Sequence, residues 1–254
     1  MKASHWLRQL AAAGRWTFTT TEAQHALGGT PIAVQAALRR LRKKGELLVP
    51  VRGFHVIVPR EILYRGVVPP DLYLAELLEH LGEHWYVGLA SAARVHGAED
   101  VPGLALQVVV AWTRPGFACA GHRVEFIGRA NVADVPVLEV DGEWGPLRVS
   151  MAEATAMDLV GYAGRVGGIE VASRLVGQLA PTMDPQHLLE VVPLSPLAWV
   201  QRLGWLLEQA GAEGCAEALG AFVDLASPSY VPLEPSGRVS GSRNRRWRVV
   251  LASP

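Results

Sequence analysis

Lysine is scarce in this chain of 254 residues and occurs only at positions 2, 43 and 44. The chain after Lys44 therefore contains no side-chain amine that could serve in a P-loop or form a Schiff base. A nuclease core in which paired carboxylates work with a neighbouring lysine would require the same amine. These absences argue against three classes of enzyme, and we predict that the chain is not an enzyme.

Cysteine is rarer still, since only Cys119 and Cys215 are present. They are too few and too far apart to form a metal knuckle, so we expect packed free thiols in a reducing compartment. No run of eighteen apolar residues occurs, and Arg8 interrupts the apolar residues that follow Lys2. A secretory signal and a membrane span are both excluded by these patterns, which predict a cytoplasmic protein.

Metal-binding patterns are weak in this sequence. The segment from His80 to His84 matches H-x-x-E-H, but Gly82 weakens the helix that would have to hold both histidines. Acids that could hold Mg²⁺ also occur at strand ends and turns, where acids are common for structural reasons. We therefore predict neither a metal nor another cofactor. These acids are Asp134, Glu139, Asp141 and Glu143.

The formal net charge is zero, but the two signs are separated along the chain. Residues 1–60 hold ten basic side chains and two acidic ones, whereas residues 61–234 hold nine basic and twenty-two acidic ones. The last twenty residues add five arginines and no acid. A basic first segment is typical of a polyanion binder, so the charge pattern places nucleic-acid binding at the amino end.

Residues 19–45 have the order of a helix-turn-helix. Threonines at 19–21 can cap a short helix over Glu22 to Leu27, and Gly28-Gly29 supplies the turn. Thr30-Pro31 then begins a second helix. The threonine hydroxyl can accept a hydrogen bond from an unpaired backbone N–H of the first turn, and proline suits the first helical position because it has no backbone N–H. Gly45 suits the left-handed position that ends this helix. The second helix is the predicted recognition helix.

Periodicity divides this helix into two faces. Val34, Leu38 and Leu41 share one stripe of a 3.6-residue period, which predicts burial. The opposite side is cationic and suits DNA. We predict that Gln35 and Arg39 read base edges, since amide and guanidinium groups can each make paired bonds to a base. We predict that four side chains face the major groove: Thr30, Gln35, Arg39 and Lys43. Three more are predicted to contact phosphates: Arg40, Lys44 and Arg52.

Two apolar segments after Gly45 predict a hairpin. Leu47 to Val51 and Phe54 to Val58 can pair about the two-residue loop Arg52-Gly53, whose glycine tolerates positive φ. Pro50 cannot donate to a ladder, so the hairpin should lie at a sheet edge. A hairpin in this position is a wing, and Arg52 lies at its tip.

The rest of the chain alternates strand-like and helix-like segments. Strands are predicted at 104–111, 122–128, 136–140 and 146–149, and helices near 71–81, 88–97, 169–179, 185–192, 196–209 and 212–226. Ser150 to Glu153 has the pattern of a capping box. Residues 227–246 should be mobile because Pro, Gly, Ser and Arg dominate there, and Trp247 to Leu251 could add a last strand.

These elements predict an α+β fold. A winged helix-turn-helix DNA-binding domain takes residues 1–60, and a larger mixed α/β domain with a small sheet and several helices takes residues 61–234. A basic flexible tail with a possible final strand takes residues 235–254.

Several segments together resemble the AbiEi family of antitoxins, in order and in spacing. The resemblance covers most of the chain, although His55 stands where the family usually has tyrosine and residues 99–102 replace a glutamine-containing stretch. The segments are 51–59 (VRGFHVIVP), 66–70 (GVVPP), 86–97 (YVGLASAARVHG), 107–110 (QVVV), Val149-Ser150 with Glu153, 158–160 (DLV) and Gly167-Gly168.

The resemblance implies a winged helix-turn-helix joined to a carboxyl-terminal antitoxin domain. It implies that the first domain represses its own operon by binding operator DNA at inverted repeats. It further implies that the second domain counters a nucleotidyltransferase-like toxin of a type IV system without forming a stable complex.

Two alternatives stay open from the residues. One is a ligand-responsive winged-helix transcriptional regulator, whose acidic second domain senses a small molecule. The other is a metal-dependent hydrolase that uses the acids between Asp134 and Glu143 or the pair His80 and His84.

Overall fold

The computed structural model describes residues 2–63, 67–119, 121–226, 229–237 and 240–251. The chain divides into two compact units. Both contain helices and strands, which confirms the α+β class. The domain limits at residues 60 and 234 remain predictions. The first unit comprises Met1–His84, Thr113–Ile127 and Val140–Leu147, and the second comprises Trp85–Trp112, Gly128–Glu139 and Arg148–Pro254.

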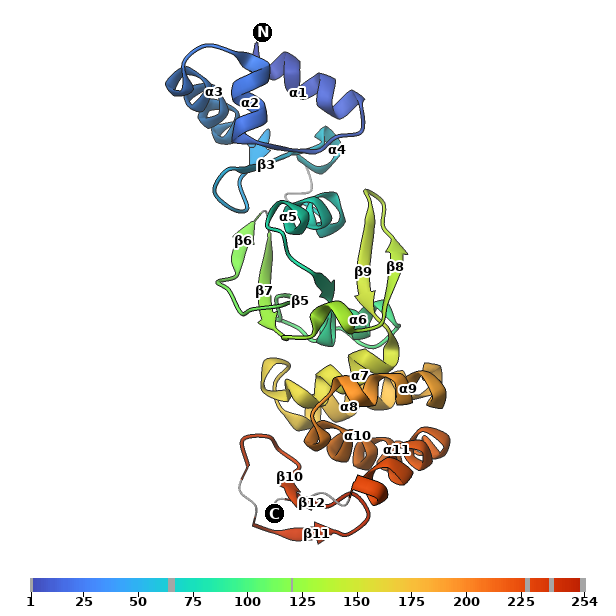
Figure 1. The fold of residues 1–254 in the computed structure, drawn as a ribbon. Helices are drawn as coiled ribbons and strands as arrows, with labels where there is room; N and C mark the ends of the chain where they lie inside the picture. The colour runs from blue at the N-terminus through green and yellow to red at the C-terminus, as the bar shows by residue number, and fades with distance from the viewer. Residues whose placement is uncertain (1, 64–66, 120, 227–228, 238–239, 252–254) are drawn as a thin grey trace. The chain divides into compact units, whose positions relative to one another are not determined.

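The amino-terminal part of the first unit combines three helices with a small sheet (Figure 1). The sheet is antiparallel and has the strand order β1-β3-β2, so β2 lies at one edge. The second and third helices, joined through Gly28-Gly29, form the predicted helix-turn-helix. The elements are α1 (Ala3–Ala12), β1 (Thr17–Thr19), α2 (Thr20–Leu27), α3 (Pro31–Lys43), β2 (Leu47–Leu48) and β3 (Phe54–Ile57).

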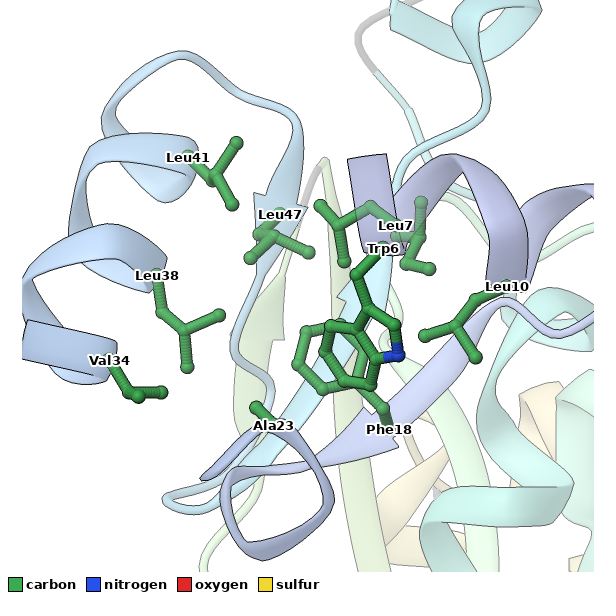
Figure 2. Packing of buried hydrophobic residues seen from close by; sticks show 10 residues of the cluster. Trp6, Leu7, Leu10, Phe18, Ala23, Val34, Leu38, Leu41 and Leu47 are labelled. Atoms are coloured by element: carbon green, nitrogen blue, oxygen red, sulfur yellow. The ribbon is translucent and has the colours of Figure 1, made fainter. Parts of the chain in front are cut away.

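A hydrophobic core joins these elements. Figure 2 shows Val34, Leu38 and Leu41 directed from α3 toward Leu47 and the aromatic side chains of the cluster. The ring of Trp6 from α1 meets Phe18 from β1 edge to face, with centroids 4.8 Å apart. The predicted buried stripe of α3 is therefore confirmed, and its burial fixes which face of the helix turns outward.

Strand β3 is covered on both faces. His55 stacks on Phe18, and Ile57 belongs to the same core as Phe18. Phe54 and Val56 belong to a second core. Because successive residues of a strand point to opposite faces, β3 separates two cores. The second core comprises Phe54, Val56, Val58, Ile62, Val68, Leu72, Tyr73 and Leu77.

The first unit continues beyond the small sheet with short elements. Asp71 joins two of its segments, because its Oδ2 accepts a hydrogen bond from the backbone N–H of Trp144 at 3.2 Å. The predicted helix near 71–81 is present as a 3₁₀ turn followed by a helix. These elements are α4 (Arg60–Leu63), η1 (Pro70–Leu72), α5 (Leu74–His80) and the antiparallel pair β6 (Phe117–Cys119) and β7 (His122–Gly128).

A larger mixed sheet has the strand order β6-β7-β5-β4-β9-β8. Within it, β4 pairs antiparallel with β5 and parallel with β9. The four predicted strands are confirmed, whereas β4 and β6 were not predicted. The remaining bounds are β4 (Trp85–Val87), β5 (Leu106–Val110), β8 (Val137–Asp141) and β9 (Pro146–Ser150).

Helices dominate the second unit. The helices α7, α8, α10 and α11 pack in successive pairs, in the yellow-to-red part of the chain (Figure 1). The predicted helices are confirmed within a few residues. They are α6 (Leu89–Val95), α7 (Ala152–Gly161), α8 (Ile169–Leu179), α9 (Pro185–Val191), α10 (Leu197–Gln209) and α11 (Glu213–Ala226), with 3₁₀ turns η2 (Val132–Asp134), η3 (Ala163–Arg165), η4 (Ala180–Thr182) and η5 (Val192–Leu194).

The predicted capping box at Ser150 to Glu153 is wrong. Helix α7 has Met151 at its N-cap, without a side-chain cap bond. Ser150 ends β9 and its hydroxyl lies 2.7 Å from that of Thr155. Glu153 is buried and its Oε1 accepts the backbone N–H of Asp184 at 2.7 Å. Ser150 and Glu153 therefore bond to other residues instead of capping the start of α7.

Part of the segment expected to be mobile forms a small sheet instead. The order is β10-β12-β11, with Trp247 completely buried before the last strand. The Trp247 indole N–H donates to Glu208 at 2.5 Å, and Gln201 donates to the carbonyl of Trp247 at 3.2 Å. Residues 227–228, 238–239 and 252–254 lie outside the described residues. The strands are β10 (Val231–Pro232), β11 (Ser242–Asn244) and β12 (Val249–Leu251), the last being the predicted final strand.

No helix in the described ranges combines the length and the apolar character that crossing a bilayer requires.

Candidate nucleic-acid interface

Local chemistry fixes the two ends of α3. The Thr30 hydroxyl accepts the backbone N–H of Ala33 at 3.3 Å, and Pro31 occupies the first helical position. Gly45 follows the C-cap Lys44 with a φ of +75°, in the left-handed region that favours glycine. These signals confirm the predicted bounds of the helix.

Burial of one stripe leaves the rest of α3 in solvent. Val34, Leu38 and Leu41 are only 3%, 5% and 6% exposed. All seven predicted DNA-contacting residues are exposed: Thr30, Gln35, Arg39, Arg40, Lys43, Lys44 and Arg52. The predicted outward face is therefore accessible, and whether it contacts DNA remains a prediction.

A hollow of about 380 Å³ lies between α3 and the segment that leads into β3. Gln35 and Arg39 line it from the helix, and Arg52 lines it from the tip of the wing. The structure thus brings the two predicted base-reading residues together with the predicted phosphate contact of the wing. The complete lining is Thr20, Gln35, Leu38, Arg39, Arg42, Val49, Arg52, Gly53 and His55.

The other four predicted residues do not line this hollow. Thr30 uses its hydroxyl for the helix cap. Arg40, Lys43 and Lys44 are exposed elsewhere on the last turns of α3. They widen the cationic surface without joining the hollow.

Three polar or charged lining residues were missing from the predicted site: Thr20, Arg42 and His55. Arg42 could have been found from periodicity, because it follows Arg39 by three residues and Gln35 by seven. The other two required the pairing of β1 with β3, which joins Phe18 to His55 across the sheet. By itself the sequence indicates only a capping role for Thr19 to Thr21.

His55 is the most enclosed polar group of the hollow. Its Nε2 lies 2.8 Å from the hydroxyl of Thr20, and its ring stacks on Phe18 with centroids 4.9 Å apart. Burial lowers the pKa of His55, and the positive charge of Arg42 acts in the same direction. Both effects favour the neutral imidazole, which supports the wall of the hollow through Thr20.

The cations of this surface have no carboxylate partner among the residues that the structure describes. In the described part of the chain, no carboxylate forms an ion pair with the exposed cations of α3 or with Arg52. Arg15, by contrast, pairs with Glu22 at 2.7 Å. Unpaired cations on one helix and one loop produce a positive field that an external polyanion can meet.

The predicted wing differs from the structure in its register. Leu48 pairs with Val56, whereas the turn is closed by the N–H of Phe54 donating to Val51 at 3.2 Å. The ladder and the turn are therefore offset by one residue, and β2 ends at Leu48. Arg52-Gly53 still forms the centre of the turn, with Gly53 at a φ of +90°. Pro50, which cannot donate to a ladder, lies where the pairing has stopped.

A different polar cluster is buried in the second unit. Asp158 forms an ion pair with Arg129 and accepts the Tyr86 hydroxyl at 2.8 Å. Arg129 also donates to the carbonyl of Leu194 at 2.9 Å and stacks near Trp199. Burial raises the pKa of Asp158, although the adjacent guanidinium opposes that shift. Sequence spacing gave no signal for this pair, which we interpret as structural because its donors and acceptors are matched.

The metal-binding patterns remain weak in the structure. His80 and His84 are both exposed, and so are the four acids that could hold Mg²⁺. Within the described ranges, no group of three or more histidine, cysteine or acidic side chains is placed to hold a metal ion. Cys119 lies in β6 and Cys215 is buried in α11, both as free thiols.

The chain is similar to known proteins both in sequence and in fold. Residues 86–209 match the family described as AbiEi antitoxin C-terminal domain. The crystal structure of the RV2827C protein from Mycobacterium tuberculosis is similar in fold, with a TM-score of 0.70 and 19% sequence identity over 98% of this chain and 90% of that chain. No curated protein matches the chain.

Proposed function

We propose that the chain is the antitoxin of a type IV toxin–antitoxin system, because residues 86–209 match the AbiEi antitoxin C-terminal domain. In this proposal the amino-terminal winged helix-turn-helix represses the chain's own operon, and the second domain counters a nucleotidyltransferase-like toxin. The toxin is a functional counterpart, and no stable complex with it is expected.

One observation carries the DNA-binding half of the proposal. Gln35, Arg39, Arg42 and Arg52 converge on one hollow between a helix and the turn of a wing. A helix-turn-helix places its second helix in the major groove, while a wing lies along phosphates. Groups suited to bases and groups suited to phosphates are thus within reach of one duplex. Operator DNA, with inverted repeats, is the proposed partner.

The first test separates base recognition from phosphate binding. Arg39→Ala should weaken binding to the operator by about 1–3 kcal/mol and relax sequence preference at one position. Lys44→Ala should weaken binding to all duplexes about equally, because a phosphate contact carries no sequence information. Titration of both variants against operator and scrambled duplexes measures the difference. Operator affinity of Arg39→Ala equal to that of the parent would remove this assignment.

The second test asks whether toxin neutralisation needs DNA binding. A full-length Arg39→Ala/Arg52→Ala variant, co-expressed with the neighbouring toxin from an unrelated promoter, should protect cells as well as the parent does. Its operon, however, should lose repression. Loss of protection at equal protein levels would contradict the division of tasks between the two domains.

Deleting residues 1–60 is a poor version of that experiment. Phe54, Val56 and Val58 share a core with Tyr73 and Leu77. Removing them would expose apolar surface and destabilise the remainder. Substitutions on the exposed face of α3 avoid this problem.

A further inference from the structure

Ile32 is an exposed apolar side chain on a cationic helix. It is the second residue of α3 and is 80% exposed. It belongs to neither of the two cores of the first unit. With Gln35, Ala36 and Arg39 it occupies positions i, i+3, i+4 and i+7, so these four residues share one stripe of the helix. That stripe faces away from the buried residues Val34 and Leu38.

The fold gives no reason for isoleucine at this position. The side chain buries little apolar surface, so it contributes little hydrophobic stabilisation. Isoleucine is also a weaker helix former than alanine, because its branched Cβ restricts its rotamers. Its chemistry becomes useful only if something outside this chain contacts it.

The major groove offers one apolar group on its base edges, the C5-methyl group of thymine. Residues in the first turns of a recognition helix are those that reach base edges. Because Ile32 lies one turn before Gln35 and Ala36 on the same stripe, a helix that brings Gln35 to a base also brings Ile32 into the groove.

We propose that Ile32 contacts a thymine methyl group and thereby selects a T·A pair in each half-site of the operator. This inference rests on the proposed DNA-binding function and adds a specificity determinant to it. A protein partner is the other conceivable occupant of an exposed apolar side chain. The flanking cations Arg39, Arg40 and Lys43 favour the nucleic acid, because the stripe lies within an unpaired positive surface.

The test uses the full-length chain and the duplex that it enriches most strongly from random-sequence DNA. Each thymine of that duplex is replaced, one at a time, by deoxyuridine, which lacks only the methyl group. One replacement in each half-site should weaken binding about fourfold, the factor expected for one buried methyl group. In Ile32→Ala the same replacement should have no effect, and the variant should bind the thymine duplex about four- to tenfold less tightly than the parent.

Leu225→Ala is the matched control, because Leu225 is an aliphatic residue of α11 that is 89% exposed. It should bind the thymine and deoxyuridine duplexes as the parent does. The inference is overturned if Ile32→Ala keeps the preference for thymine. It is also overturned if no thymine methyl group affects binding and Ile32→Ala changes the molar mass of the free protein, because Ile32 would then contact a protein partner. Failure to enrich any sequence would instead refute the DNA-binding proposal, and this inference with it.

Discussion

Raising the salt concentration from about 50 to about 200 mM should weaken binding of the full-length chain to its operator by roughly a thousandfold. Each phosphate that a cation neutralises releases counterions, so the logarithm of the affinity falls linearly with the logarithm of the salt concentration. Six exposed cations without ion pairs in the described part of the chain are available to displace counterions, and two of them, Arg39 and Lys43, are proposed to do so from the major groove. The six are Arg39, Arg40, Arg42, Lys43, Lys44 and Arg52.

The slope of this dependence provides a residue-level check. Arg40→Ala/Lys44→Ala should reduce the slope of log affinity against log salt by about two, since each phosphate contact contributes about 0.9. Arg174→Ala removes an exposed arginine from α8 in the acidic second unit and should leave the slope unchanged. Fluorescence anisotropy over a salt series measures all three proteins. An affinity that scarcely changes with salt would contradict the proposed phosphate contacts.

Asp158→Ala should lower the free energy of unfolding by about 3–5 kcal/mol. Both partners of the Arg129–Asp158 pair are almost fully buried. Removing the carboxylate leaves a buried guanidinium without its counter-charge and leaves the Tyr86 hydroxyl without its acceptor. Urea unfolding, with the same slope used for parent and variant, gives the difference in stability.

A surface ion pair supplies the control for this measurement. Arg94 and Asp100 are 3.9 Å apart and mostly exposed. Asp100→Ala should therefore change stability by no more than about 1 kcal/mol. An Asp158→Ala variant as stable as Asp100→Ala would show that the buried pair is not needed for the fold. Replacing both buried partners, as in Arg129→Met/Asp158→Leu, should restore part of the loss.

Helix α3 could be predicted because its signals are local. Thr30 and Pro31 act within one turn of the helix start, and Gly45, in the left-handed region, directly follows the C-cap residue. The buried stripe depends only on the helical period. Element type and bounds therefore followed from neighbouring residues.

The hollow beside α3 could be predicted only in part. Gln35 and Arg39 were found from the helix, but the opposite wall depends on β1, which pairs with residues about 37 positions later. Thr19 also caps α2, and its local role was the one that the sequence revealed. Because strand pairing across such a separation leaves no local pattern, Thr20 and His55 were missed.

Buried polar groups were the least predictable feature. Asp158 lies in a helix whose residues from Ala152 to Val160 are all buried, so periodicity does not distinguish it from an outward acid. Its partner Arg129 lies just beyond the end of β7. Only the folded chain shows that Ser150 and Glu153 likewise bond to residues outside the expected capping box.

The enclosure of β3 between two cores has a consequence for the energetics of association. The strand that leads directly away from the Arg52 turn is held on both faces, so that turn begins from a fixed base. Because the Arg52 turn is already ordered, it loses little conformational freedom when a partner binds. The entropic cost of binding is correspondingly small. We expect Phe54→Ala, which loosens this support, to weaken DNA affinity by an entropic penalty, although the Phe54 side chain itself is buried.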